Sequence, residues 1–303
     1  MTHTILPNEM EFVLNTSFST RQKQIFTKLN LQYEKINIEE RDRYIISVID
    51  YLLSSAVVSS GEHRISDWEN GWKENLDMYK NSGDINSIIP KYHGKHTLVH
   101  WRQEMVRPVT PLFDYLIHTF LVDWVFEKYL HSVDTILEFG CGPAYHLLRF
   151  KNINNKANFV GLDWAESSQE IIKELNKTNI VGRNFNYFNP DYTLDIKPNS
   201  GIITIASLEQ IGDKFDLFLN FLLEKKPVIC VHLEPIDEVL NQNNLIDRLS
   251  MLYFKKRNYL KGFVTKLKHL EDEGKVEIVN IQRTYTGSYF VEGHTLVVWK
   301  PKI

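Results

Sequence analysis

Apolar residues form short runs in the second half of the chain and follow a helical spacing in the first half. The runs alternate with polar segments and lie at 133–139, 157–162, 201–206 and 227–234. Short runs of this kind are typical of buried parallel strands. A helix face with apolar residues three or four positions apart is formed by Ile45, Val48, Ile49, Leu52 and Leu53. The pattern predicts a helical N-terminal region followed by an α/β unit.

The remaining segments complete this outline. Two further strands are predicted at 275–285 and 294–299, joined by a turn region. The segment at about 236–273 is predicted to be a helical insertion, and the apolar segment from Leu112 to Leu130 a helix that covers the sheet. We therefore expect a helical cap at 1–130 and one α/β domain at 131–303.

Composition and charge narrow the function classes. The chain has 303 residues, of which 43% are hydrophobic and 24% charged, as in ordinary globular enzymes. A net charge of -3 argues against a general nucleic-acid binder, which needs a basic surface. No apolar run has the length of a membrane span and the first residues lack signal-peptide character, so a cytoplasmic location is expected. Two cysteines, Cys141 and Cys230, support neither a disulfide framework nor a thiolate metal site.

Two closely spaced glycines follow the first predicted strand. The run ends in Glu138, Phe139, Gly140, Cys141 and Gly142, and a helix can begin soon after. Glycine is needed where the backbone takes a positive φ or where a ligand approaches it closely. The second run ends in Asp163, at the spacing where a βαβ unit places a carboxylate near a ribose. These residues predict a nucleoside-bearing cofactor.

The charge of the turn separates two cofactor classes. A dinucleotide fingerprint has a third glycine where this chain has Tyr145. Glu138 would repel a diphosphate, but it suits the ammonium and sulfonium groups of S-adenosylmethionine. The sequence favours the sulfonium cofactor, with an NAD-dependent enzyme as the rival.

The same residues resemble the class I S-adenosylmethionine-dependent methyltransferases, whose first two motifs match 138–142 and 160–163. The resemblance implies a Rossmann-like, seven-stranded methyltransferase sheet, S-adenosylmethionine as cofactor and S-adenosylhomocysteine as product. It implies that the methionine end lies by Glu138, Gly140, Cys141 and Gly142, the ribose by Asp163 and the adenine by Trp164. It covers residues 133 to 235 firmly.

Two further family features have looser matches. The family places a polar residue after the third strand against the adenine amine, and both Asn189 and Asp191 fit this position. The fourth motif, beside the methyl-transfer centre, matches the segment that contains Ser207, Glu209 and Gln210. Many small-molecule members have histidine where this chain has Gln210, so hydrogen bonding to cofactor or acceptor is expected here in place of acid–base chemistry.

The fifth strand carries the candidate catalytic residues. His232 and Glu234 are two residues apart, so they should share one face at the C-terminal end of the sheet, where open α/β sheets bind ligands. We expect His232 to act as general base for an acceptor hydroxyl, and Glu234 to orient or bind the acceptor. A histidine hydrogen-bonded beneath a loop is the alternative, and a divalent metal on both residues stays open. No other metal site is predicted.

The expected reaction is O-methylation of a small molecule, such as a sugar, a nucleotide-sugar or a related metabolite. Candidate acceptor contacts are Trp68 and Trp72 in the cap and Arg257 and Tyr259 in the insertion, although aromatic packing and a solvated basic helix face are the favoured explanations of these residues. N-methylation of a small amine and a catalytically inactive cofactor-binding module that binds a partner are the alternatives.

Overall fold

The parallel strands form a seven-stranded sheet in the computed structural model, which describes residues 1–302. The strand order is β10-β12-β9-β8-β5-β6-β7, and only β12 runs antiparallel to both of its neighbours among these described strands. The strands are β5 (Thr135–Phe139), β6 (Asn158–Asp163), β7 (Ile180–Asn184), β8 (Ser200–Ile205), β9 (Ile229–Glu234), β10 (Val276–Arg283) and β12 (Thr295–Pro301). The predicted Rossmann-like methyltransferase sheet is confirmed.

Successive residues of each strand enter different cores, as strand alternation requires. Ile136 and Ile203 pack in one hydrophobic cluster with helices α5 to α7, whereas Leu137 and Ile202 pack in a second cluster with α8 and α10. The helices of this part are α5 (Phe113–Tyr129), α6 (Tyr145–Ile153), α7 (Glu166–Leu175), α8 (Asp216–Lys225), α9 (Leu245–Arg257) and α10 (Phe263–Asp272). The sheet therefore forms the middle of three layers.

The sequence pattern predicted a helical N-terminal region, but the structure has strands there as well as helices. This region contains four short strands, β1 to β4, which form a five-stranded second sheet together with β11 from the C-terminal part, in the order β1-β2-β4-β3-β11. The strands are β1 (Thr2–Thr4), β2 (Gln32–Lys35), β3 (Val99–Trp101), β4 (Glu104–Pro108) and β11 (Thr286–Gly287). Each has only two to five residues, which is too short for a visible apolar alternation.

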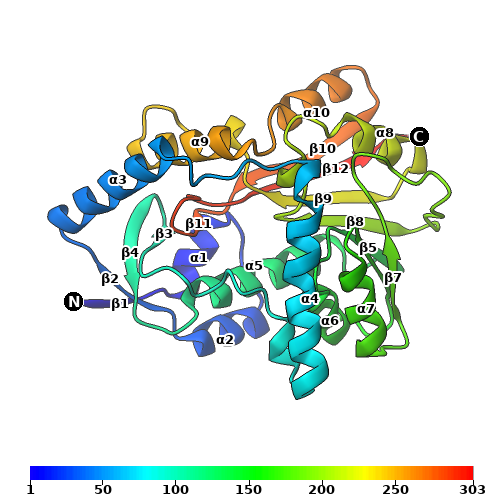
Figure 1. Ribbon diagram of the computed structural model, residues 1–303, viewed down its shortest axis with the longest axis horizontal. Coiled ribbons are helices and arrows are strands. Elements are labelled where there is room, and N and C mark those ends of the chain that lie inside the picture. The colour runs from blue at the N-terminus through cyan, green and yellow to red at the C-terminus, as the bar shows by residue number, and fades with distance from the viewer. Residues whose placement is uncertain (303) are drawn as a thin grey trace.

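Helices surround the second sheet and connect it to the first. They are α1 (Pro7–Val13), α2 (Thr20–Leu29), α3 (Ile38–Leu53) and α4 (Ile65–Ser82), with 3₁₀ turns η1 (Glu62–Arg64) and η2 (Ile85–Ile88). α4 packs against α7, and α3 packs against α9 of the insertion. Figure 1 shows the small sheet at the left, the large sheet at the right and α4 in cyan between them. No helix within residues 1–302 is long and apolar enough to cross a membrane.

Candidate functional site

The glycine turn after β5 has the backbone geometry that the sequence predicted. Gly140 and Gly142 have φ angles of +71° and +50°. A Cβ at Gly140 would lie 2.3 Å from Ser207 Cβ, and a Cβ at Gly142 would lie 2.8 Å from Trp72 Cζ2. Both glycines therefore lie where no side chain fits. Cys141 between them is buried, and burial raises the pKa of its thiol, which makes it a packing residue and not a nucleophile.

A cavity of about 370 Å³ opens at this turn. It extends from the C-terminal ends of the parallel strands to the N-terminal region and the insertion, so all three parts of the chain contribute walls. The part of the lining that comes from the segments after the parallel strands includes Gly140, Cys141, Gly142, Asp163, Trp164, Phe185, Tyr187, Ser207, Glu209 and Gln210. The other lining residues include Trp68, Trp72, Tyr92, His93, His118, Tyr145, His146, Tyr253, Arg257, Tyr259, Phe290 and His294.

Asp163 lies at the end of β6 with its carboxylate in the cavity wall. Its two oxygens accept the backbone N–H groups of Gly142 and Ala165, at 2.9 Å each. Burial raises its pKa to about 6, in spite of these two donors. Each oxygen has a further lone pair, so the carboxylate can still accept from a ligand. Trp164 beside it stacks on Phe188, with ring centroids 6.0 Å apart.

Asn189 and Asp191 do not line the cavity, and the expectation that one of them contacts the adenine amine stays a prediction. Both side chains are exposed. Asp191 Oδ1 accepts the backbone N–H of Thr193 (2.8 Å), which closes a local turn on the surface. The residues after β7 that do line the cavity are Phe185 and Tyr187.

The loop after β8 is held from behind by Glu234. This fully buried carboxylate accepts the backbone N–H groups of Ser207, Leu208 and Glu209 at 3.1–3.2 Å. It therefore fixes the 3₁₀ turn η3 (Leu208–Ile211) but does not line the cavity. The expected contact between Glu234 and an acceptor is wrong, because the loop lies between them.

Glu209 and Gln210, in this loop, do line the cavity. Gln210 Nε2 donates to Glu209 Oε1 (2.8 Å), and Ser60 Oγ donates to Gln210 Oε1 (3.0 Å). Burial and the carboxylate of Glu234 raise the pKa of Glu209. Near neutral pH the Glu209 carboxyl therefore tends to keep its proton and to act as a hydrogen-bond donor.

His232 lies in the core, and its expected contact with an acceptor is also wrong. Trp299 Nε1 donates to His232 Nε2 (3.0 Å), so His232 Nδ1 carries the proton and donates to Thr204 Oγ1 (2.9 Å). The side chain is fully buried, does not line the cavity, and burial lowers its pKa to about 3. Strand alternation places the residue, but the sequence does not reveal that Trp299 and Thr204 occupy both nitrogens.

Glu138 makes a contact that the sequence did not predict. Its Oε1 lies 2.7 Å from His146 Nδ1, and both residues are buried. Glu138 Oε2 and His146 Nε2 have no hydrogen-bond partner among residues 1–302. Glu138 does not itself line the cavity, whereas His146, which it contacts, does. An unpartnered buried carboxylate oxygen next to the glycine turn fits a positively charged ligand group.

Three other histidines surround this pair in the cavity wall. The His118 ring centroid lies 5.5 Å from that of His93, and 5.8 Å from those of His146 and His294. Burial lowers the pKa of His93 and His294 to about 4, and that of His118 well below 6.5. No group of three or more metal-ligating side chains within residues 1–302 has the geometry of a metal site. His93, His118 and His294 are therefore neutral imidazoles at neutral pH.

Trp68, Trp72, Arg257 and Tyr259, the candidate acceptor contacts, all line the cavity. The two tryptophans lie one turn apart on α4 and stack at 5.6 Å. The Arg257 guanidinium lies over the Tyr259 ring (5.2 Å) and donates to the Val58 carbonyl. The basic residues at the end of α9 differ in their surroundings. Lys255 and Lys256 are exposed, whereas Arg257 lines the cavity.

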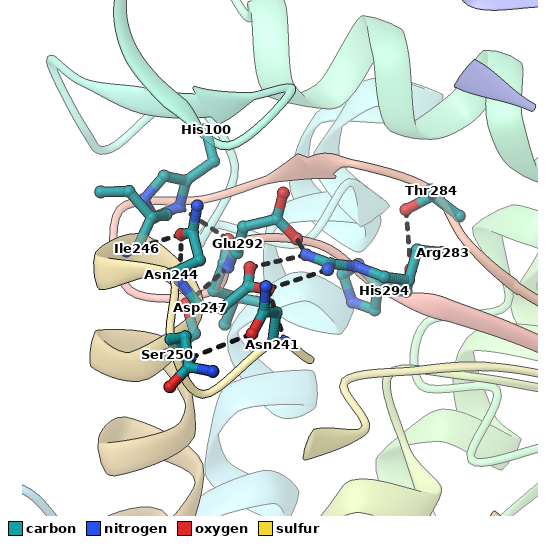
Figure 2. Close-up of polar contacts among 12 residues, drawn as sticks. His100, Asn241, Asn244, Ile246, Asp247, Ser250, Arg283, Thr284, Glu292 and His294 are labelled. Carbon is teal, nitrogen blue, oxygen red and sulfur yellow. Dashed lines mark hydrogen bonds and ion pairs between the residues drawn. The ribbon is translucent and has the colours of Figure 1, made fainter. Parts of the chain in front are cut away.

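A buried ion-pair network fixes the segment 284–294, which supplies Thr286, Ser288, Phe290 and His294 to the cavity wall (Figure 2). Arg283 Nη1 and Nη2 donate to the two oxygens of Asp247 on α9 (2.8 and 2.6 Å), and Nη2 also donates to Glu292 Oε2 (2.6 Å). Asp247 and Glu292 are at most 1% exposed. The network connects α9 of the insertion to the part of the cavity wall that segment 284–294 forms.

Comparisons with known proteins agree with this architecture. No protein-family model and no curated protein sequence matches the chain. The crystal structure of the [4+2]-cyclase SpnF is similar with a TM-score of 0.51 at 12% identity, over 81% of this chain and 98% of that one. The N-methyltransferase NodS from Bradyrhizobium japonicum WM9, in complex with S-adenosylhomocysteine, gives 0.45 at 11% identity, over 62% and 86%. At such identities, the similarity to SpnF shows the fold alone.

Proposed function

We propose that this chain, which has the fold of the class I S-adenosylmethionine-dependent methyltransferases, transfers a methyl group from S-adenosylmethionine to a hydroxyl of a small molecule. The observation that carries the proposal is a single cavity. It joins the glycine turn and Asp163 to a chamber of histidines and aromatic rings that the N-terminal region and the insertion close. Residues 1–130 act as the cap and residues 131–303 as the catalytic domain.

The residues at the strand ends fit the cofactor. Glu138 Oε2, buried and unpartnered, suits the ammonium or sulfonium charge, and Asp163 has free lone pairs for ribose hydroxyls. Trp164 offers a ring face for the adenine. When bound, S-adenosylmethionine supplies a methyl carbon on a positively charged sulfur. An NAD-type diphosphate would meet the negative charge of Glu138 and Asp163 instead.

The chamber favours a neutral acceptor. Arg257 is the only lysine or arginine that lines it in the described part of the chain. Aromatic rings with histidine and tyrosine polar groups suit a sugar or a related hydroxylated metabolite, whereas a nucleotide-sugar diphosphate would find one cation. We place this reaction in the cytoplasm and without a nucleic-acid partner, in line with the net charge of -3.

The protein's own task is to position the acceptor and exclude water. Glu234 fixes the loop after β8, Gln210 holds the Glu209 carboxyl toward the cavity, and Glu209 offers a hydrogen bond to the acceptor. The stacked Trp68 and Trp72 close the side of α4. In this proposal Glu234 acts through the loop and has no contact with substrate.

The test is a calorimetric titration of the protein with S-adenosylhomocysteine and, separately, with NADH. We expect saturable binding of the first and none of the second. Protein that binds S-adenosylhomocysteine is then incubated with methyl-labelled S-adenosylmethionine and metabolite extract, and label should enter a small molecule. Binding without any transfer would favour an inactive module or different chemistry, and label on an amine would favour N-methylation. Preference for NADH would overturn the proposal.

A further inference from the structure

We propose that His146, oriented by Glu138, is the general base that takes the proton of the acceptor hydroxyl. This inference rests on the proposed transfer of a methyl group to oxygen. It replaces His232, whose two ring nitrogens are both occupied in the core.

The first argument is the geometry of the pair. Glu138 is the last but one residue of the buried strand β5, and its Oε1 lies 2.7 Å from Nδ1 of His146 in the first turn of α6. A carboxylate only accepts hydrogen bonds, so the imidazole donates through Nδ1 and keeps its lone pair on Nε2. That Nε2 has no protein partner within residues 1–302, and His146 lines the cavity. A carboxylate behind an imidazole with a free nitrogen is the arrangement of a general base.

The second argument separates His146 from the other histidines. A proton on one of these rings repels a proton on the next, so the cluster gains at most about one positive charge. His146 alone among the four has a carboxylate in hydrogen-bond contact, whereas the Asp114 oxygen nearest to His93 is 3.9 Å from Nδ1. His146 is therefore the one histidine of the four that a carboxylate orients by a direct hydrogen bond.

The groups packed around His146 support this assignment. Tyr145 on α6 lies 3.9 Å away between ring centroids, and His118 faces it from α5. The ion pair of Arg149 with Asp123, from α6 and α5, is close to neutral as a unit. Glu138 is therefore the negative group that stabilises an imidazolium at this point. Glu209, a cavity carboxyl in the loop after β8, tends to keep its own proton because burial and Glu234 raise its pKa.

The proposed step balances in atoms and charge. His146 Nε2 takes the hydroxyl proton as the acceptor oxygen bonds to the methyl carbon and the carbon–sulfur bond breaks, with its electron pair left on sulfur. The positive charge moves from sulfur to the imidazolium, next to Glu138. His146 then returns the proton to solvent.

His146→Asn tests the role, because asparagine keeps a donor toward Glu138 but has no basic nitrogen. With an acceptor from the labelling screen, kcat should fall about 10²- to 10⁴-fold. The affinity for S-adenosylhomocysteine should change less than about threefold. The matched control, His131→Asn at an exposed position, should keep the wild-type kcat.

A second readout does not depend on activity. In protein labelled with ¹⁵N-histidine and bound to S-adenosylhomocysteine, His146 should show a protonated Nδ1 and an unprotonated Nε2, and Glu138→Gln should shift the Nδ1–H signal. Unchanged kcat in His146→Asn, a protonated Nε2, or transfer only to amines would overturn the role of His146 alone. Wild-type protein that binds no S-adenosylhomocysteine would instead overturn the methyltransferase proposal, and this inference with it.

Discussion

Trp72 lies directly over Gly142, so that a Cβ at Gly142 would stand 2.8 Å from Trp72 Cζ2. The contact joins α4 of the cap to the turn that we assign to the cofactor. We predict that Gly142→Ala weakens S-adenosylhomocysteine binding at least about tenfold, because alanine is strained at a φ of +50° and displaces the indole. Calorimetry measures the loss. The double variant Gly142→Ala/Trp72→Ala should recover part of it, and equal affinities of single and double variants would mean that the indole contact is irrelevant.

Asp163 makes cofactor affinity depend on pH. Its pKa of about 6 means that the free protein protonates this carboxyl below pH 6, which removes an acceptor for the ribose hydroxyls. The affinity for S-adenosylhomocysteine should fall below pH 6, by up to about tenfold per pH unit. Asp163→Asn should bind about 10- to 100-fold more weakly at pH 7.5 and show no such slope. Asp191→Asn, outside the cavity, is the matched control, and an equal loss there would contradict our assignment.

His232 should matter for stability and not for ligand binding. His232→Leu leaves the Trp299 N–H and the Thr204 hydroxyl without their partner, so we expect the free energy of unfolding to fall by about 1–3 kcal/mol at pH 7. Urea denaturation measures this change. The affinity for S-adenosylhomocysteine should stay within about twofold of the wild-type value. Lost activity with unchanged stability would restore His232 as the base.

The pH dependence of this variant has a definite sign. In the folded protein the pKa of His232 is about 3, whereas an unfolded histidine titrates near 6.5. Between these values only the unfolded wild-type chain takes up the proton, so the wild-type protein loses stability relative to His232→Leu as the pH falls. The difference between the two should shrink by about 1.4 kcal/mol per pH unit below 6.5. A difference that grows toward pH 5 would contradict the buried, neutral state.

Arg283 should be among the most sensitive positions of the chain. Arg283→Met leaves Asp247 and Glu292 buried without a counter-charge, and we expect a loss of about 3–5 kcal/mol in the free energy of unfolding. Adding Asp247→Asn and Glu292→Gln removes the uncompensated charges and should restore part of the stability. Chemical denaturation of both variants checks this. A single variant as stable as the wild-type protein would show that the ion pairs contribute nothing.

The sequence predicted the large sheet because its signals are local. The parallel strands β5, β6, β8 and β9 are each one apolar run, and the glycine turn and Asp163 lie at the ends of two such runs. The parallel edge strand β7 is not such a run. α4 was not predicted as a helix, because Gly71 and many polar side chains hide its period. The small sheet was missed because its strands are short and β11 pairs with β3 from far along the chain.

The candidate site was predictable to the same extent. Gly140 and Gly142 can be recognised from the sequence, because residue type and spacing alone indicate the backbone geometry that they adopt. The histidine cluster carries none, because His93, His118, His146 and His294 come from four separate segments and meet only in the fold. Whether His232 is free or occupied depends on Trp299, which is equally remote in sequence.

The strand β11, which closes the small sheet from the far end of the chain, limits how acceptor specificity can be exchanged. Thr286 and Gly287 pair with Trp101 and His100, and the same segment lines the cavity. A chimera that received only residues 1–130 from a related protein would pair a foreign β3 with the resident β11 and would combine two half-chambers of different origin. A working graft has to carry the 284–294 segment together with the cap.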